Sequence, residues 1–161
     1  MIKNNKYLLF AFFSLLGLCG CGASVVYEKN YDLKNSSWYA DSTLTFQFNI
    51  TEIDAKYNFY YNLRNTKSYP FYNLYLTYHL EDEKGNLVKT ELQNATLFDA
   101  KTGKPFGNGV GGVYTHQLLH PSLANFKFTK KGNYKFKIKQ YMRKNPLEGL
   151  QAVGIRLEKA E

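Results

Sequence analysis

The sequence has very little cysteine. Of its 161 residues only Cys19 and Cys21 are cysteines, and both lie in the stretch LLGLCGCGAS. Two cysteines one residue apart are poorly placed for an intramolecular disulfide, and no other cysteine or histidine is near enough to complete a four-ligand zinc site. The long remainder of the chain therefore has no disulfide, and its stability must come from its core.

The sequence also lacks the motifs of the common catalytic classes. Downstream of Cys21 there is no thiol and no G-x-S-x-G nucleophile motif, and the acid pair Glu52 and Asp54 has the spacing of ordinary solvated charges beside a turn. We therefore expect no enzyme and no catalytic residues.

Metal and cofactor sites are not expected either. His116 and His120 are four residues apart, but Pro121 and the strand-rich surroundings argue against a helix that would place them on one face, and no glutamate follows His116. The glycines of residues 107–112 match G-x-G-x-x-G without the helix that a dinucleotide site needs. We expect a flexible connection or a loop at the edge of a ligand site there.

The first 24 residues predict export and anchoring. Lys3 and Lys6 precede an apolar run over residues 7–16 and then small residues, which is the order of regions in a secretory signal. Leu-Cys-Gly-Cys, ending at Cys21, resembles the lipobox of bacterial lipoproteins, in which the last cysteine becomes the lipidated first residue of the mature chain. That resemblance implies a diacylglycerol and an N-acyl chain on Cys21.

An uncleaved membrane helix is the alternative for this region, because residues 7–27 carry no charge and are long enough to cross a bilayer. Gly17, Gly20 and Gly22 count against it. Both interpretations tether the same domain to a membrane. We expect a signal peptide over residues 1–20, the lipidated cysteine and a short tether over 21–24, and a single domain over 25–161.

The charge is concentrated near the end of the sequence. The chain has a formal net charge of +8, and residues 125–161 hold ten Lys or Arg against three Glu, whereas residues 21–124 are nearly balanced. Such a basic segment could face anionic lipid headgroups or an acidic partner. Nucleic acid is not an expected partner of an exported protein.

Apolar and polar residues alternate with period two over much of the chain. The alternation is clear in residues 44–50, 57–64, 74–80 and 134–141, and no segment has the period of a long helix. Polar turns at 81–86 and 99–103 separate these segments, with a weaker strand pair expected between 87 and 98. The pattern predicts an all-β fold, an antiparallel β-sandwich of immunoglobulin-like or jelly-roll-like type.

A lysine-rich face is predicted in the basic segment. If residues 126–129 pair with Tyr134–Lys139, four lysines share the face opposite the apolar side chains. These are Lys127, Lys135, Lys137 and Lys139. Either the face is solvated and its lysines protect the edge of the sheet from pairing with another chain, or the face is a docking surface for lipid or an acidic partner.

Two tyrosines fall on the polar phase of their strands. Tyr60 and Tyr75 would be exposed and could stack on sugar rings, whereas most aromatic residues between 57 and 78 fall on the core phase. With the 107–112 loop they could form the site of a glycan-binding or glycan-processing accessory lipoprotein.

Four stretches together resemble a known family. They are SWYADSTLTFQFNI (37–50), LRNTKSYPFYNLYL (63–76), GNGVGG (107–112) and YKFKIKQYMRKNPLEGLQAVGIRLEK (134–159), and they resemble the gliding-motility lipoprotein GldH family of Bacteroidetes. The resemblance implies a role in gliding and in the linked type IX secretion machinery, with other gliding or secretion lipoproteins and membrane proteins as partners. It implies no catalytic residue, and only the lipidated cysteine, Cys21, carries over with a defined chemistry.

The residues after Cys21 bear on localisation. They lack the acidic cluster that resembles a surface-export signal in this phylum. We therefore expect a lipoprotein that faces the periplasm, in the outer membrane rather than the inner one.

Overall fold

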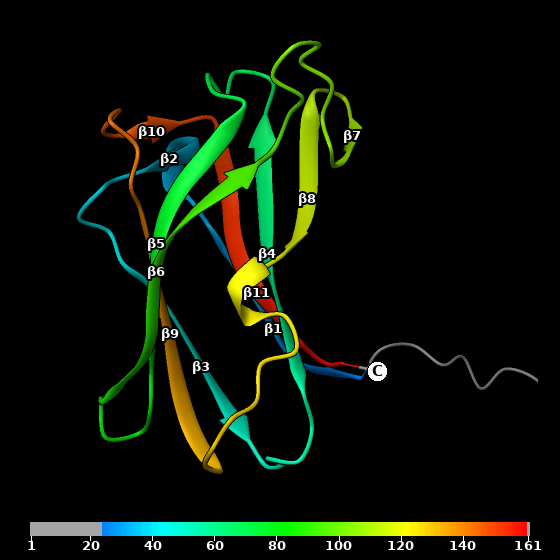
Figure 1. The fold of residues 1–161 in the computed structure, drawn as a ribbon. Helices are drawn as coiled ribbons and strands as arrows, with labels where there is room; N and C mark the ends of the chain where they lie inside the picture. The colour runs from blue at the N-terminus through cyan, green and yellow to red at the C-terminus, as the bar shows by residue number, and fades with distance from the viewer. Residues whose placement is uncertain (1–23, 161) are drawn as a thin grey trace, which may run out of the picture.

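Two antiparallel sheets face each other across a core of aromatic side chains (Figure 1). The structure is a computed structural model that describes residues 24–160. Within them it has strands and two short 3-10 helices, η1 (Lys34–Ser36) and η2 (Pro121–Leu123). The strands are β1 (Val25–Asp32), β2 (Ser37–Trp38), β3 (Leu44–Ile50), β4 (Tyr57–Thr66), β5 (Asn73–Glu81), β6 (Leu87–Thr96), β7 (Asn108–Val110), β8 (Val113–Leu119), β9 (Gly132–Gln140), β10 (Leu147–Glu148) and β11 (Leu150–Lys159). The predicted all-β antiparallel sandwich is confirmed.

The five-stranded sheet has the order β1-β11-β4-β8-β7, and the four-stranded sheet has the order β3-β9-β5-β6. β11, the last strand in the sequence, lies between β1 and β4, so Val25 is the partner of Glu158 and Phe59 the partner of Leu157. In Figure 1 the beginning of β1 and the end of β11 lie together. Among residues 24–160, no helix is long and apolar enough to cross a membrane.

The alternation of the sequence explains which face of each strand is buried. Successive strand residues point to opposite faces, so Phe46 and Phe48 of β3 and Phe136 of β9 enter the core while the polar residues between them face outward. The core rings of the two sheets meet directly. Phe59 stacks on Phe136 with ring centroids 5.4 Å apart, and Phe48 meets Phe59 edge-on at 5.9 Å.

One end of the sandwich is closed by the short pair β2 and β10. Trp38 is in register with Leu147, and both side chains are buried. The indole Nε1 of Trp38 donates to the carbonyl oxygen of Ser42 at 3.0 Å, which satisfies its polar atom within the core.

The two long sides of the sandwich differ. On one, the hydroxyl of Tyr31 in β1 donates to the carbonyl of Thr45 in β3 at 2.7 Å and links the sheets. On the other, η2 bridges β8 and β6, because Lys89 Nζ donates to the carbonyl of Ser122 at 2.6 Å.

Three details of the prediction are wrong. Residues 87–98 give one long strand, β6, where a pair was expected, and Val113–Leu119 form an unpredicted strand, β8. Residues 126–129 do not pair with β9, which lies between β3 and β5 instead. Phe126 makes an isolated bridge to Tyr57 of β4, so this segment crosses to the other sheet.

Candidate functional site

The outer face of the four-stranded sheet brings three of the four predicted lysines together. Lys135, Lys137 and Lys139 alternate along β9 with the buried Tyr134, Phe136 and Ile138. Lys137 Nζ lies 2.7 Å from a carboxylate oxygen of Glu81 in β5, whereas Lys135 and Lys139 are exposed. The face is therefore basic, with one internal ion pair.

Lys127 lies apart from this face. It is exposed, and it stands between Phe126 and Phe128 in the connection from η2 to β9. Phe128 packs in the core, with its ring 5.3 Å from that of Tyr57 and 4.6 Å from that of Tyr134. The alternation of Phe126, Lys127 and Phe128 was correctly recognised, but the partner of the segment was not.

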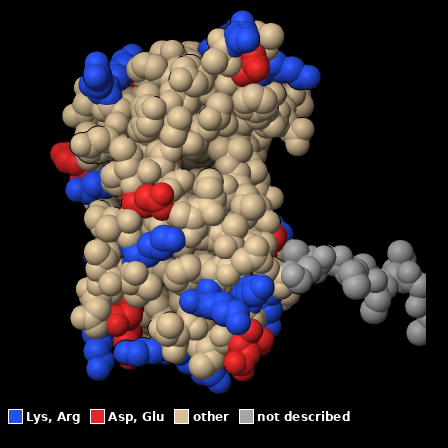
Figure 2. Space-filling view, in the orientation of Figure 1, with Lys and Arg blue, Asp and Glu red and all other residues tan. Residues whose placement is uncertain are grey.

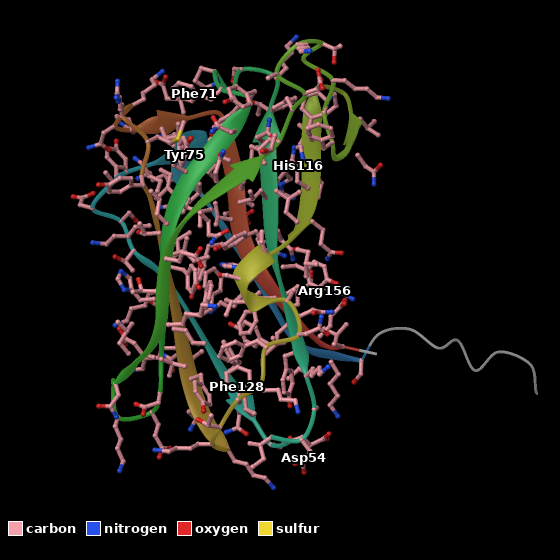
Figure 3. The ribbon with its side chains drawn as sticks, in the orientation of Figure 1. Asp54, Phe71, Tyr75, His116, Phe128 and Arg156 are labelled. Carbon is pink, nitrogen blue, oxygen red and sulfur yellow. The ribbon has the colours of Figure 1, made fainter. Side chains whose placement is uncertain are left out.

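An apolar groove adjoins the lysine face. Its volume is about 490 Å³. Its walls come from β5, β6 and the segments before β5 and after β9, namely Phe71, Asn73, Tyr75, Leu92, Tyr141, Met142 and Arg143. Tyr75 is 39% exposed, Leu92 49% and Tyr141 65%, so large apolar side chains stand open to solvent beside a basic surface. Figure 3 shows Phe71 and Tyr75 near one end of the molecule, with Asp54 at the other.

Backbone contacts fix the shape of this groove. The amide N–H of Tyr141 donates to the carbonyl of Tyr75 at 2.8 Å, and the amide N–H of Tyr75 donates to Met142 Sδ at 3.1 Å. Two stretches of the family resemblance, SYPFYN and QYMR, thus meet at one site. No sequence pattern indicates that these stretches are neighbours, because about 70 residues separate them.

Tyr60 and Tyr75 do not share a site. Tyr75 lies on the outer face of the four-stranded sheet, and Tyr60 lies on the outer face of the five-stranded sheet, where Arg156 is its register partner. Figure 3 places Arg156 and Tyr75 on opposite sides of the molecule. The core separates the two tyrosines, so they cannot contact one sugar.

The glycine-rich segment 107–112 forms a β-hairpin. Val110 of β7 is in register with Val113 of β8, and Gly111 and Gly112 turn the chain with φ of 63° and 82°, a backbone conformation that favours glycine. A Cβ on Gly107 would lie 2.2 Å from the carbonyl oxygen of Thr115. These glycines are explained by the hairpin and its close backbone approach.

The two histidines 116 and 120 are buried parts of the core. His116 Nε2 lies 3.0 Å from Asn65 Oδ1, and burial lowers its pKa. Burial lowers the pKa of His120 to about 4, partly opposed by the charge of Glu91. Within residues 24–160, no three His, Cys, Asp or Glu side chains gather as a metal site would require. His79 is exposed on the outer face of β5, as the alternation predicts.

The acid pair at 52 and 54 is exposed near the turn before β4. Glu52 accepts from Lys159 Nζ at 2.7 Å, a surface ion pair of the ordinary kind. Cys21, the predicted lipidation site, lies outside the described residues.

A polar trough that the sequence did not predict lies on the outer face of the five-stranded sheet. Its volume is about 210 Å³, and its walls include Glu28 and Asn30 of β1, Asn62 and Arg64 of β4 and Gln117 of β8. The outline of the molecule is hollowed on the side of β8, beneath the β7 hairpin (Figure 2).

The comparisons with known proteins point to one family. The sequence profile of the family described as "GldH lipoprotein" matches residues 25–157. A protein named "Gliding motility lipoprotein GldH" from Flavobacterium johnsoniae is 32% identical over 167 residues, which cover 99% of both chains. A homologue from Christiangramia forsetii is 28% identical and covers 98% of this chain and 99% of its own.

A solved structure of infectious bursal disease virus, Gx strain, aligns with 84% of this chain and 30% of its own at a TM-score of 0.41 and 17% identity. A TM-score of this size does not establish a shared fold.

Proposed function

Because the chain belongs to the GldH lipoprotein family, a family of gliding motility lipoproteins, we propose that it serves as a structural or assembly component of the gliding apparatus and of the type IX secretion machinery linked with it. In this proposal it is non-catalytic and lipidated at Cys21. It faces the periplasm from the outer membrane and acts by holding protein partners.

The observation that carries this proposal is the surface of the four-stranded sheet. A basic face of Lys135, Lys137 and Lys139 continues into an apolar groove with Arg143 at its wall. Exposed apolar side chains that form a continuous hollow are typical of protein interaction sites. The cores of such interfaces are enriched in aromatic residues, methionine and arginine. These residue types make up much of the apolar groove.

The chemistry of the groove indicates the kind of partner. Tyr75, Leu92 and Tyr141 offer apolar area, while Arg143 and the neighbouring lysines favour negative charge. The proposed partner is therefore a protein segment that carries apolar side chains flanked by Asp or Glu.

The short tether supports a position close to the membrane. Only three residues separate Cys21 from Val25, where β1 begins. At roughly 3.5 Å per residue, they span about 10 Å, so a domain anchored at Cys21 would stay beside the lipid surface or its neighbouring lipoproteins.

Deletion of the gene in its own host tests the proposal. We expect loss of colony spreading together with loss of the proteins normally released into the medium. Loss of spreading alone would confine the function to motility and remove the secretion part of the proposal. A deletion strain that spreads and secretes as the parent does would refute the proposal as a whole.

A further inference from the structure

We propose that the polar trough on the five-stranded sheet is a binding site for a saccharide. This inference is independent of the proposed function, which rests on the other sheet. It also differs from the sugar site expected from the sequence, because it excludes Tyr75 and the 107–112 hairpin.

The registers of four strands define the trough. Outward-facing side chains that are in register across β1, β11, β4 and β8 form three rows. The first row is Glu28, Arg156, Tyr60 and Leu119. The second row is Asn30, Gly154, Asn62 and Gln117. The third row is Asp32, Ala152, Arg64 and Thr115. In each of the last two rows the β11 position is a small residue between larger ones. Ala152 lines the hollow, and the missing side chain at Gly154 lets Asn30 of β1 lie across β11 and line the hollow as well.

Gly154 is required by its neighbour in β1. A Cβ at this position would lie 1.9 Å from Asn30 Oδ1 and 2.5 Å from the carbonyl oxygen of Lys29. The amide of Asn30 thus lies close against the backbone of β11 at Gly154, and Asn30 lines the trough. Any larger residue at 154 would displace it.

Hydrogen bonds hold the walls of the trough in place before any ligand arrives. Asn62 Nδ2 donates to Glu28 Oε1 at 2.8 Å, and Gln117 Nε2 lies 3.4 Å from Asn62 Oδ1. Arg64 is paired with Asp32 at 2.7 Å, and Arg156 with Glu28 at 2.9 Å. Side chains that are already oriented lose little conformational entropy when they bind a ligand.

The chemistry of these groups selects a hydroxyl-rich, neutral ligand. Two acids and two arginines balance in charge across the three rows, so neither an anion nor a cation is favoured. The middle row offers three side-chain amides, and each amide has both donor and acceptor atoms. Such amides can form hydrogen bonds with hydroxyl groups, which also donate and accept. Saccharides present such hydroxyls in adjacent pairs.

The first row supplies the apolar contact that a sugar ring also needs. Tyr60 is half-buried between Arg156 and Leu119, two residues along β4 from Asn62 and on the same face. Tyr60 lies beside the residues that line the hollow, and an amphipathic tyrosine ring there can cover the C–H face of a sugar that extends out of the hollow. The hollow of about 210 Å³ is smaller than the roughly 300–1,000 Å³ of sites for drug-sized ligands, so it would take about one ring and leave the rest of a glycan outside.

Co-sedimentation of the detergent-solubilised full chain with insoluble polysaccharides tests this site. The probes are cellulose, chitin and peptidoglycan sacculi, the last with and without enzymatic removal of their stem peptides. We expect the protein to sediment with at least one of them. The variants Asn62→Ala and Gln117→Ala should each reduce the bound fraction by roughly tenfold, because each removes polar contacts to the ligand.

The matched control is Gln47→Ala, which shortens an exposed amide on the outer face of the other sheet. All three variants should keep the thermal unfolding midpoint of the wild type, since the changed side chains are at the surface, and the control should sediment as the wild type does. No binding to any probe, or equal losses in the control and the trough variants, would overturn the proposal. Binding that disappears with the stem peptides would mean that the trough takes peptide and would equally overturn it.

Discussion

The imidazole ring of His120 packs edge-on against the ring of Tyr78, with the ring centroids 4.5 Å apart. Two more aromatic rings lie beside it, Tyr61 at 5.0 Å and Phe136 at 6.4 Å, and the hydroxyl of Ser122 lies 3.4 Å from its Nδ1. A neutral imidazole suits this core, whereas an imidazolium would lose its hydration there. The histidine therefore links the stability of the sandwich to pH.

The direction of this linkage follows from the pKa. Burial lowers the pKa of His120 from 6.5 in the unfolded chain to about 4 in the folded chain. Between these values the unfolded state binds more protons, so we expect His120 to remove about 3 kcal/mol of stability as the pH falls from 7 to 4. Its neutral form contributes fully above pH 6.5.

Urea denaturation at pH 7.5 and pH 4.5 measures this effect. His120→Phe, which keeps an aromatic ring without a titrating group, should lose much less stability at pH 4.5 than the wild type does. The buried His116 stays in both proteins and contributes in the same direction. A His120→Phe protein that loses as much stability between the two pH values as the wild type does would contradict the assignment.

Gly154→Ala should destabilise the pairing of β1 with β11. The new Cβ would overlap both Asn30 Oδ1 and the carbonyl oxygen of Lys29, and the second of these is backbone that cannot turn aside. We expect a loss of about 2 kcal/mol in the free energy of unfolding, as for other overpacking changes.

Gly103→Ala is the comparison for this change, because Gly103 has a φ of 68° and no atom near its added Cβ. It should cost only about 1 kcal/mol, the cost of an alanine in a left-handed conformation. If Gly154→Ala were no more damaging than Gly103→Ala in urea denaturation, the close approach of β1 would not be as described.

Removal of the predicted lipidation site should release the protein. Cys21→Ser cannot receive the diacylglycerol and N-acyl chains that give stable membrane binding, so the protein should move to the soluble periplasmic fraction. Cys19→Ser is the matched control, because Cys19 would be removed with the signal peptide. Cys21→Ser protein that stays with the membrane after a carbonate wash would disprove lipid anchoring.

The apolar groove should be needed for gliding. A double variant with Tyr75→Ser and Tyr141→Ser removes much of its exposed apolar area without touching the core. Expressed in the deletion strain, it should accumulate as the wild type does yet fail to restore colony spreading.

Phe106→Ser is the control for the groove, because Phe106 is 62% exposed and lies outside it. That variant should restore spreading. Full spreading in the double variant would show that the groove does not take part, and the partner contact would have to lie elsewhere.

Hydrophobic alternation predicted β3, β4 and β5 almost to the residue, because each strand buries one face and exposes the other. The same rule failed for the partner of residues 126–129. Alternation says which side chains enter a core, and Phe128 does enter it, but it does not say to which sheet the backbone pairs.

β8 was missed for a different reason. Its inward phase includes His116, a buried polar residue whose Nε2 donates to Oδ1 of Asn65 in β4. A buried polar pair of this kind hides the strand from any count of apolar residues. Only the fold brings the two partners together across 51 positions of the sequence.

Prediction of the candidate sites from the sequence is limited in the same way, because a pattern within one strand does not show which strands are neighbours. Three lysines of the predicted face follow from the alternation of β9 and do lie together, although Lys127 does not join them; the groove and the trough combine residues from several segments. The trough leaves one local sign, the small residues Ala152 and Gly154 at alternate positions of an otherwise bulky strand. That sign becomes meaningful only when the neighbours of β11 are known.

The position of β11 has a consequence for the order of events in the cell. Arg156 of β11 is in register with Glu28 of β1 on one side and with Tyr60 of β4 on the other, so the five-stranded sheet is built around the last of the strands that the structure describes. Until those residues leave the ribosome, β1 and β4 lack their common neighbour. Pairing between segments so distant in sequence is also slow to form. The five-stranded sheet can therefore complete its pairing only once β11 is available, whereas the four-stranded sheet does not include β11 and can pair earlier.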